Sequence, residues 1–275
     1  MFIIEAVGLA FLGAITVWLL HRNLSRPSHD RAWVPFHKEL PYGEYAPDGT
    51  ILVHNIRRAR YRTEFDYNVS YHGGLYDPQT LKRVWFCVAP YKTGQAHTFL
   101  SFEFNDGRYL AVSVEVRKTH AESFKAWMVA LWNYEIFYIL ADEQDILWLR
   151  TNIWKGNVML YPTHLPRIAA QKVFASVVEG VNDFYKKPRF YRVLYRNCTS
   201  VPMNHLRAGA PTLPKFDFRY IATSEADRVL YAHNLIDTDT PLADARKRYN
   251  VTSKAQSLAC DETFSKRVRE GIMPR

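Results

Sequence analysis

The sequence predicts an α+β fold in which an antiparallel sheet is packed against helices. Runs rich in β-branched and aromatic residues, bounded by turn residues, indicate strands at residues 51–56, 84–89, 98–104, 109–117 and 136–140. Apolar residues at helical spacing indicate helices at residues 121–132, 165–185 and 199–207. Because most of the strands precede the helices, the pattern favours an α+β over an alternating α/β arrangement.

The composition is that of a folded chain with a basic surface. Hydrophobic residues make up 48% of the 275 residues, and the net charge is +9. Such a charge favours an anionic partner, either nucleic acid or an anionic lipid surface, although a generic basic surface would look the same. The basic residues do not cluster into a recognisable nucleic-acid-binding module, so we expect no nucleic-acid partner.

The three cysteines, Cys87, Cys198 and Cys260, cannot all pair, so at least one thiol is free. None of them has the spacing of a zinc site, and the ten histidines show no metal-binding pattern. We therefore expect no metal and no cofactor. The oligomeric state is left open.

Residues 2–20 are apolar apart from Glu5 and Thr16. This length is close to the ~20 residues that a membrane-spanning helix needs. No basic region precedes the segment and no cleavage site follows it, so we predict an uncleaved transmembrane anchor at residues 1–21, with a buried core helix as the alternative. Residues 22–47, rich in proline and charge, are predicted to form a stem that leads to a folded domain at residues 48–275.

The flanking charges bear on membrane orientation. Arg22, Arg26 and Arg31 follow the apolar segment. The positive-inside rule would keep the domain that follows them in the cytoplasm.

The segment HTFLSFEF-NDG-RYLAVSVEVR is predicted to be a β-hairpin with alternating apolar and polar faces. A two-residue Asp-Gly turn would pair opposite faces, whereas a three-residue loop at residues 105–107, with Gly107 left-handed, brings the apolar faces together. In that register His97 lies opposite Glu115, with Cβ atoms ~4.5–5.5 Å apart. A surface cross-strand pair is the alternative to a functional one.

Cys198 lies in the segment YRNCTSVPMNHLR, where Asn197, Cys198 and Thr199 lead into the third predicted helix. Free N–H groups at a helix N-terminus favour a thiolate, and Arg196 adds positive charge nearby. A histidine held by a carboxylate would supply the base that such a nucleophile needs. A buried structural cysteine is the alternative; Cys87, in an apolar strand, suits that role better.

Several segments together resemble the DUF4105 family, also called the Lnb N-terminal periplasmic domain family. They are the hairpin just described, DEQDILWLRTN, VMLYP, RNCTS and the terminal FSKRVREG, and the resemblance extends from Trp33 to the C-terminus. That family is similar to the permuted NlpC/P60 papain-like enzymes, in which the histidine strand precedes the cysteine helix. The resemblance therefore implies a permuted NlpC/P60 antiparallel sheet with packed helices, joined here to an N-terminal transmembrane helix.

The family's namesake is a bacterial lipoprotein N-acyltransferase, which implies a thioester acyl-enzyme. By motif, Cys198 carries over as the nucleophile, His97 as its base and Glu115 as the group that orients the base. Supporting candidates are Ser113, Arg117 and Asn197. The implied partners are a membrane and a phospholipid or lipidated protein substrate. The implied location is the bacterial inner membrane with a periplasmic domain, although the flanking charges point the other way.

Two other functions are compatible with the sequence. The same site could use water as the acceptor, which would make the protein a lipid esterase or a cell-wall peptidase or amidase. A non-catalytic envelope-binding domain is the third hypothesis; the intact His97, Glu115 and Cys198 argue against it.

Overall fold

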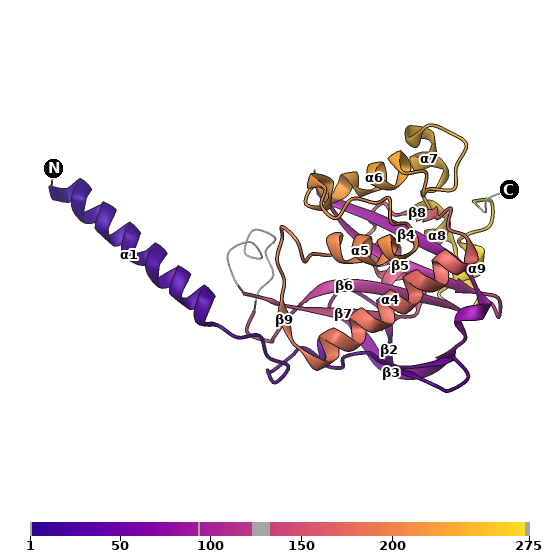
Figure 1. Ribbon diagram of the computed structural model, residues 1–275, viewed down its shortest axis with the longest axis horizontal. Helices are drawn as coiled ribbons and strands as arrows, with labels where there is room; N and C mark the ends of the chain where they lie inside the picture. Colours follow the sequence, from indigo (N-terminus) through magenta and orange to yellow (C-terminus); the bar gives the residue numbers. More distant parts are fainter. Residues whose placement is uncertain (1, 93, 123–132, 273–275) are drawn as a thin grey trace.

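The computed structural model describes residues 2–92, 94–122 and 133–272, and it confirms a mixed α+β fold (Figure 1). Among these residues nine strands form one sheet, in the order β1-β2-β7-β6-β5-β4-β8, with β3 paired to β2 and β9 paired to β7. The strands are β1 Tyr42–Tyr45, β2 Ile51–Tyr61, β3 Tyr67–Tyr76, β4 Leu81–Lys92, β5 Gln95–Phe104, β6 Tyr109–Arg117, β7 Glu135–Ala141, β8 Met159–Pro162 and β9 Arg189–Phe190.

All five predicted strands are present, as β2, β4, β5, β6 and β7. The sheet is antiparallel as expected except where β2 runs parallel to β7. Sequence patterns missed β3, which contains Gly73, Gly74 and polar residues and is half-exposed along most of its length. Backbone pairing with β2, rather than burial of an apolar face, holds this strand in the sheet.

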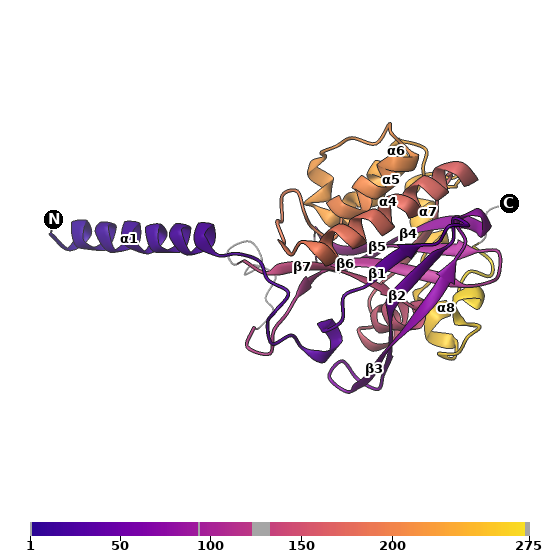
Figure 2. The same ribbon diagram turned by 60° about the horizontal axis from the view of Figure 1, so that its bottom comes forward.

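Helices α4 (Arg167–Lys186) and α5 (Ser200–Gly209) cover one face of the sheet (Figures 1 and 2). In α4 the buried residues recur at helical spacing and include Val173, Val177 and Val181, as the predicted helix at residues 165–185 requires. The helix predicted at residues 121–132 falls almost entirely outside the described residues. The other helical segments are α3 Glu143–Trp148, the π-helix η3 Leu149–Ile153, α6 Ala226–Ala232, α7 Leu242–Arg248, α8 Thr252–Ser257 and α9 Phe264–Arg267, with short 3₁₀ turns η1 Pro35–His37, η2 Pro78–Thr80, η4 Phe218–Tyr220 and η5 Thr223–Glu225.

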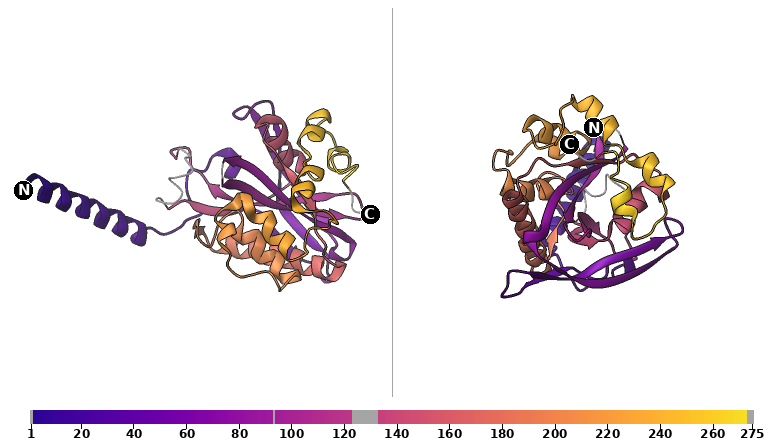
Figure 3. Two further views of the ribbon diagram at one scale, coloured as in Figure 1. Left: turned by 90° about the horizontal axis from the view of Figure 1, so that it is seen from above. Right: turned by 90° about the vertical axis from the view of Figure 1, so that its right-hand side faces the viewer.

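Helix α1 (Phe2–Leu24) projects away from the domain (Figures 1 and 3). Within the described ranges no helix combines the length and the apolar character needed to cross a bilayer, which corrects the transmembrane anchor predicted at residues 1–21.

Much of the predicted stem at residues 22–47 packs against the domain. Trp33 forms a β-bridge with Thr119 and is buried, and β1 joins the sheet through β2. The Arg117 side chain reaches this segment, donating from Nε to the His37 carbonyl at 2.9 Å and from Nη2 to the Lys38 carbonyl at 2.6 Å. Proline and charge, which suggested an exposed stem, here accompany a segment fixed by long-range contacts.

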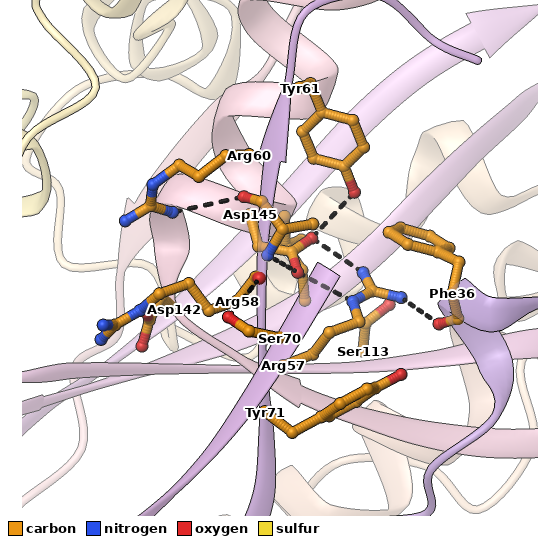
Figure 4. Close-up of polar contacts among 12 residues, drawn as sticks. Phe36, Arg57, Arg58, Arg60, Tyr61, Ser70, Tyr71, Ser113, Asp142 and Asp145 are labelled. Carbon is orange, nitrogen blue, oxygen red and sulfur yellow. Dashed lines mark hydrogen bonds and ion pairs between the residues drawn. The ribbon is translucent and has the colours of Figure 1, made fainter. Parts of the chain in front are cut away.

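A buried ion pair joins α3 to β2 (Figure 4). Asp145 accepts hydrogen bonds from Nε and Nη2 of Arg57, both at 2.8 Å, from the Ala59 amide at 2.9 Å and from the Tyr61 hydroxyl at 3.0 Å. Arg57 also donates to the carbonyl of Phe36 at 3.2 Å. Because both charges are removed from water, this geometry must satisfy nearly all of their hydrogen-bonding capacity.

Candidate functional site

The β5–β6 hairpin has the predicted register. Phe99 pairs with Ser113, the Phe104 amide donates to the Arg108 carbonyl, and Gly107 has φ +85°. The three-residue loop at residues 105–107 is therefore confirmed. It places the side chains at positions 97, 113 and 115 on one face of the sheet.

On that face His97, Ser113 and Glu115 form a hydrogen-bonded chain. Ser113 Oγ lies 2.7 Å from His97 Nε2 and donates to Glu115 Oε1 at 2.9 Å, while the direct distance from His97 Nε2 to Glu115 Oε1 is 3.6 Å. Since Ser113 gives its proton to the carboxylate, it accepts from the imidazole, which puts the His97 proton on Nε2. Nδ1 is then the nitrogen able to accept a proton. Ser113, expected to be a lesser candidate, is the direct partner of His97.

Arg150 completes this chain and was not found by sequence reasoning. Its Nη2 donates to Glu115 Oε1 at 3.0 Å, and its Nη1 donates to the Ile146 carbonyl at 2.9 Å. The residue lies in the π-helix η3, a distortion that occurs often at functional sites. The sole sequence signal was an arginine within the otherwise apolar run ILWLR.

Burial and the charge of Arg150 keep the imidazole neutral. Together they lower the pKa of His97 to about 3, although the charge of Glu115 partly opposes them. Burial raises the pKa of Glu115, but Arg150 and then His97 more than offset it, so the carboxyl group has a pKa below its usual range. Glu115 is therefore a carboxylate that pairs with Arg150, and His97 is poised as a neutral base.

Arg150→Gln should raise the pKa of His97, because it removes the nearest positive charge while leaving the burial in place. Titration of the His97 ring by NMR measures the change. Arg58→Gln, which removes an exposed arginine paired with Asp142, serves as the control and should leave the His97 pKa unchanged. An unaltered His97 pKa in Arg150→Gln would contradict the electrostatic role given to Arg150.

Asn197 fixes the backbone at the start of α5. Its Oδ1 accepts from the amides of Thr199 and Ser200, both at 2.7 Å, and its own amide donates to Ser200 Oγ at 2.9 Å. The side-chain Nδ2 donates to the Tyr220 carbonyl at 3.0 Å. These hydrogen bonds satisfy the amides of Thr199 and Ser200 and hold Cys198 in the turn just before α5.

Cys198 lies against the first half of β5. The β5–β6 ladder ends at the Phe99–Ser113 pair, although β5 continues back to Gln95. Beyond this pair Cys198 Sγ lies 3.8 Å from the Ala96 carbonyl, and the Thr98 hydroxyl donates to the Cys198 carbonyl at 2.7 Å. The cysteine thus contacts both residues that flank His97.

The predicted thiol–imidazole hydrogen bond is not among the contacts of Cys198 with the described residues, because Sγ is directed at Ala96. Direct approach of the thiol to the His97 ring remains a prediction.

Tyr191 is a second residue that sequence reasoning missed. The Cys198 amide donates to its hydroxyl at 3.2 Å. Burial raises the pKa of the Cys198 thiol, and hydrogen bonds from Tyr191, the Thr98 backbone and Thr199 only partly oppose this rise. The resting group is therefore a neutral thiol rather than the thiolate expected at a helix N-terminus. Burial outweighs the helix dipole here.

Alkylation of Cys198 by iodoacetamide should consequently be slow at pH 7 and accelerate as the pH rises into the alkaline range. Tyr191→Phe should shift this profile to higher pH, because it removes a hydrogen bond that favours the thiolate. Tyr91→Phe, which alters an exposed tyrosine nearby, should not. A plateau of rapid alkylation below pH 7 would instead indicate a resting thiolate–imidazolium pair.

Arg117, two residues beyond Glu115 in β6, directs its guanidinium group to the carbonyls of His37 and Lys38. Its supporting role at the site stays a prediction. Cys87 is fully buried in β4, and Cys260 lies near Gln144. Among the described residues no group of histidine, cysteine and carboxylate side chains could hold a metal ion.

These observations define an α+β protein in which a cysteine at the start of a helix lies against a strand bearing a hydrogen-bonded histidine. Residues 68–224 match the Lnb N-terminal periplasmic domain family, so the chain belongs to this family. The matched region includes every residue of the candidate site, from His97 to Cys198. Membership indicates a periplasmic location. No curated protein and no solved structure matched the chain.

Proposed function

We propose that the protein is a cysteine-dependent acyltransferase that carries an acyl chain from a phospholipid to an amine, with a lipoprotein as a suitable acceptor. The observation that carries the proposal is the position of Cys198 against β5 on both sides of His97, whose imidazole is hydrogen-bonded to Ser113 and through it to Glu115. The order of the histidine strand and the cysteine helix supports a permuted NlpC/P60 arrangement within this proposal.

In the first step the Cys198 side chain rotates toward His97, and the thiol proton passes to Nδ1. The thiolate sulfur attacks the ester carbonyl carbon of the lipid. The C–O bond then breaks, and His97 returns the proton to the leaving alkoxide, which departs as a lysophospholipid hydroxyl. Ser113 and Glu115 stabilise the imidazolium during this step, since Ser113 accepts the hydrogen bond from Nε2 and the Glu115 carboxylate offsets the positive charge.

In the second step an amine attacks the thioester carbonyl. His97 takes a proton from the amine nitrogen, the C–S bond breaks, and the proton returns to the Cys198 sulfur. The product is an amide, and the thiol is regenerated. Water in place of the amine would give a hydrolase on the same residues, which is the alternative function.

The surroundings of Cys198 favour a lipid over a polar substrate. The side chains of Tyr91, Leu194 and Tyr195 are exposed. Tyr91 interacts electrostatically with Cys198, and Leu194 and Tyr195 precede Cys198 in the same loop. The thiol itself is buried and neutral. Exposed apolar side chains suit contact with an acyl chain, and a buried thioester is shielded from water.

The test is intact-protein mass spectrometry after incubation with phospholipid. An added mass equal to one acyl chain is expected on the unaltered chain and on Cys260→Ala, but not on Cys198→Ala. The trapped thioester should then decay faster with an added amine than in buffer alone. Equal decay rates would favour the hydrolase, and the absence of any adduct would contradict thioester chemistry.

A further inference from the structure

The loop that joins β9 to Cys198 has an apolar tip between two arginines. The amide of Arg192 donates to the carbonyl of Arg196 at 2.9 Å, and the amide of Arg196 donates back at 2.8 Å. This closure forces Leu194 and Tyr195 outward, where they are 61% and 58% exposed. Both side chains lie outside the hydrophobic core that the described residues form.

The positive charge around this tip is concentrated and largely unneutralised. Arg189 forms an ion pair with Asp183 at 2.5 Å, whereas Arg192 and Arg196 have no carboxylate partner among the described residues. Burial and the charges of Arg189 and Arg192 lower the pKa of Arg196. Arg192 and Arg196 therefore place two positive charges beside the apolar tip that form no ion pair with the described residues, and such a pair favours an anion.

The tip lies at the end of the domain from which α1 leaves (Figures 1 and 3). The Ser28 amide donates to Glu135 Oε1 at 3.3 Å, and Glu135 pairs with Phe190 across β7 and β9. Residue 190 directly precedes the loop. In α1 the apolar side chains at positions 12, 17, 20 and 24 are exposed. Two apolar elements separated along the chain therefore emerge at the same end.

From this combination we propose that the loop formed by residues 191–197, the arginine loop, docks onto an anionic phospholipid surface. Leu194 and Tyr195 enter the headgroup region, and Arg192 and Arg196 contact lipid phosphates. A protein interface needs about 800 Å² from each partner, more than this tip offers, whereas interfacial insertion needs only a few apolar side chains flanked by cations. The inference rests on the proposed function, for which it supplies the route of the substrate to Cys198.

The test measures the environment of the loop tip directly, because α1 could bind vesicles even if the arginine loop does not. In the full chain carrying Cys198→Ala and Cys260→Ala, Tyr195→Cys receives an environment-sensitive fluorophore; Cys87 is fully buried and should not react. Leu75→Cys, at an exposed position on β3, receives the same label as the control. Vesicles of phosphatidylcholine alone are compared with vesicles that also contain phosphatidylglycerol.

We expect the label at position 195 to shift to shorter wavelength with phosphatidylglycerol vesicles and to respond much less to phosphatidylcholine. The label at position 75 should not respond. Arg192→Gln with Arg196→Gln should weaken the response about tenfold or more, since each arginine near an anionic surface contributes roughly a fivefold gain in binding. Lys172→Gln with Lys247→Gln removes the same charge from α4 and α7 and should have little effect.

A label at position 195 that remains aqueous, whether or not the protein sediments with the vesicles, would overturn the proposal. Equal responses to both lipids, or equal weakening by both pairs of substitutions, would overturn the role of the arginines. Because every sample lacks the Cys198 thiol, docking is measured without turnover. If the label shows no docking while the unaltered chain still forms the acyl adduct, this inference fails and the proposed acyltransferase stands. If the label shows docking and no adduct forms, the proposed acyltransferase fails and this inference stands.

Discussion

Cys198→Ala and His97→Ala should each abolish acyl transfer, with a loss of about 10⁴-fold or more. Combining them should add little, because the nucleophile and its base act as one unit. Transfer of a labelled acyl chain from phospholipid to an amine measures the loss. Cys260→Ala, which alters a cysteine remote from the site, should retain activity.

Two variants with smaller expected effects test the hydrogen bonds that link His97 to Ser113 and Glu115. Ser113→Ala removes the direct partner of the imidazole, and Glu115→Gln removes the charge beyond it. Both should lower kcat by less than the loss of His97. Ser113→Ala should lower it by more than Glu115→Gln, because Ser113 Oγ lies 2.7 Å from His97 Nε2 and Glu115 Oε1 lies 3.6 Å from it. Full activity in Ser113→Ala would show that the observed chain is structural.

Asp145→Asn should reduce the free energy of unfolding by about 3–5 kcal/mol, because it leaves the buried Arg57 without a counter-charge. Both side chains are nearly inaccessible to solvent. Urea denaturation measures the loss. The fold should persist, since the core around β4, β5 and β6 is independent of this pair.

The matched control is Asp66→Asn, which breaks the ion pair between Arg62 and Asp66. Both of these side chains are more than half exposed, and exposed pairs contribute little to stability. Its denaturation curve should be nearly that of the unaltered chain. Equal losses in the two variants would show that burial does not decide the strength of the Arg57–Asp145 interaction.

Local sequence patterns succeeded where one face of an element is buried. The alternation in β5 and β6 fixed their register, because a slip by one residue would turn every apolar side chain to the polar face. The helical spacing in α4 likewise placed that helix. At the N-terminus the same reasoning failed: a run of apolar residues suggested a membrane span, and prolines suggested a stem, although residues around Trp33 pack against the sheet.

By itself, the sequence determined the hairpin register, the helix that follows Cys198 and the choice of His97, Glu115 and Cys198 as a candidate site. The tertiary structure alone decided what surrounds them. Arg150 hydrogen-bonds to Glu115 from 35 residues away, and Cys198 contacts Ala96 across 102 residues. Contacts between residues so far apart in the sequence leave no periodic pattern from which they could be predicted. Protonation was likewise decided only in three dimensions: a helix N-terminus favours a thiolate, but burial at the junction of β5, β6 and α5 keeps Cys198 a thiol and His97 neutral, because desolvation penalises whichever form is charged.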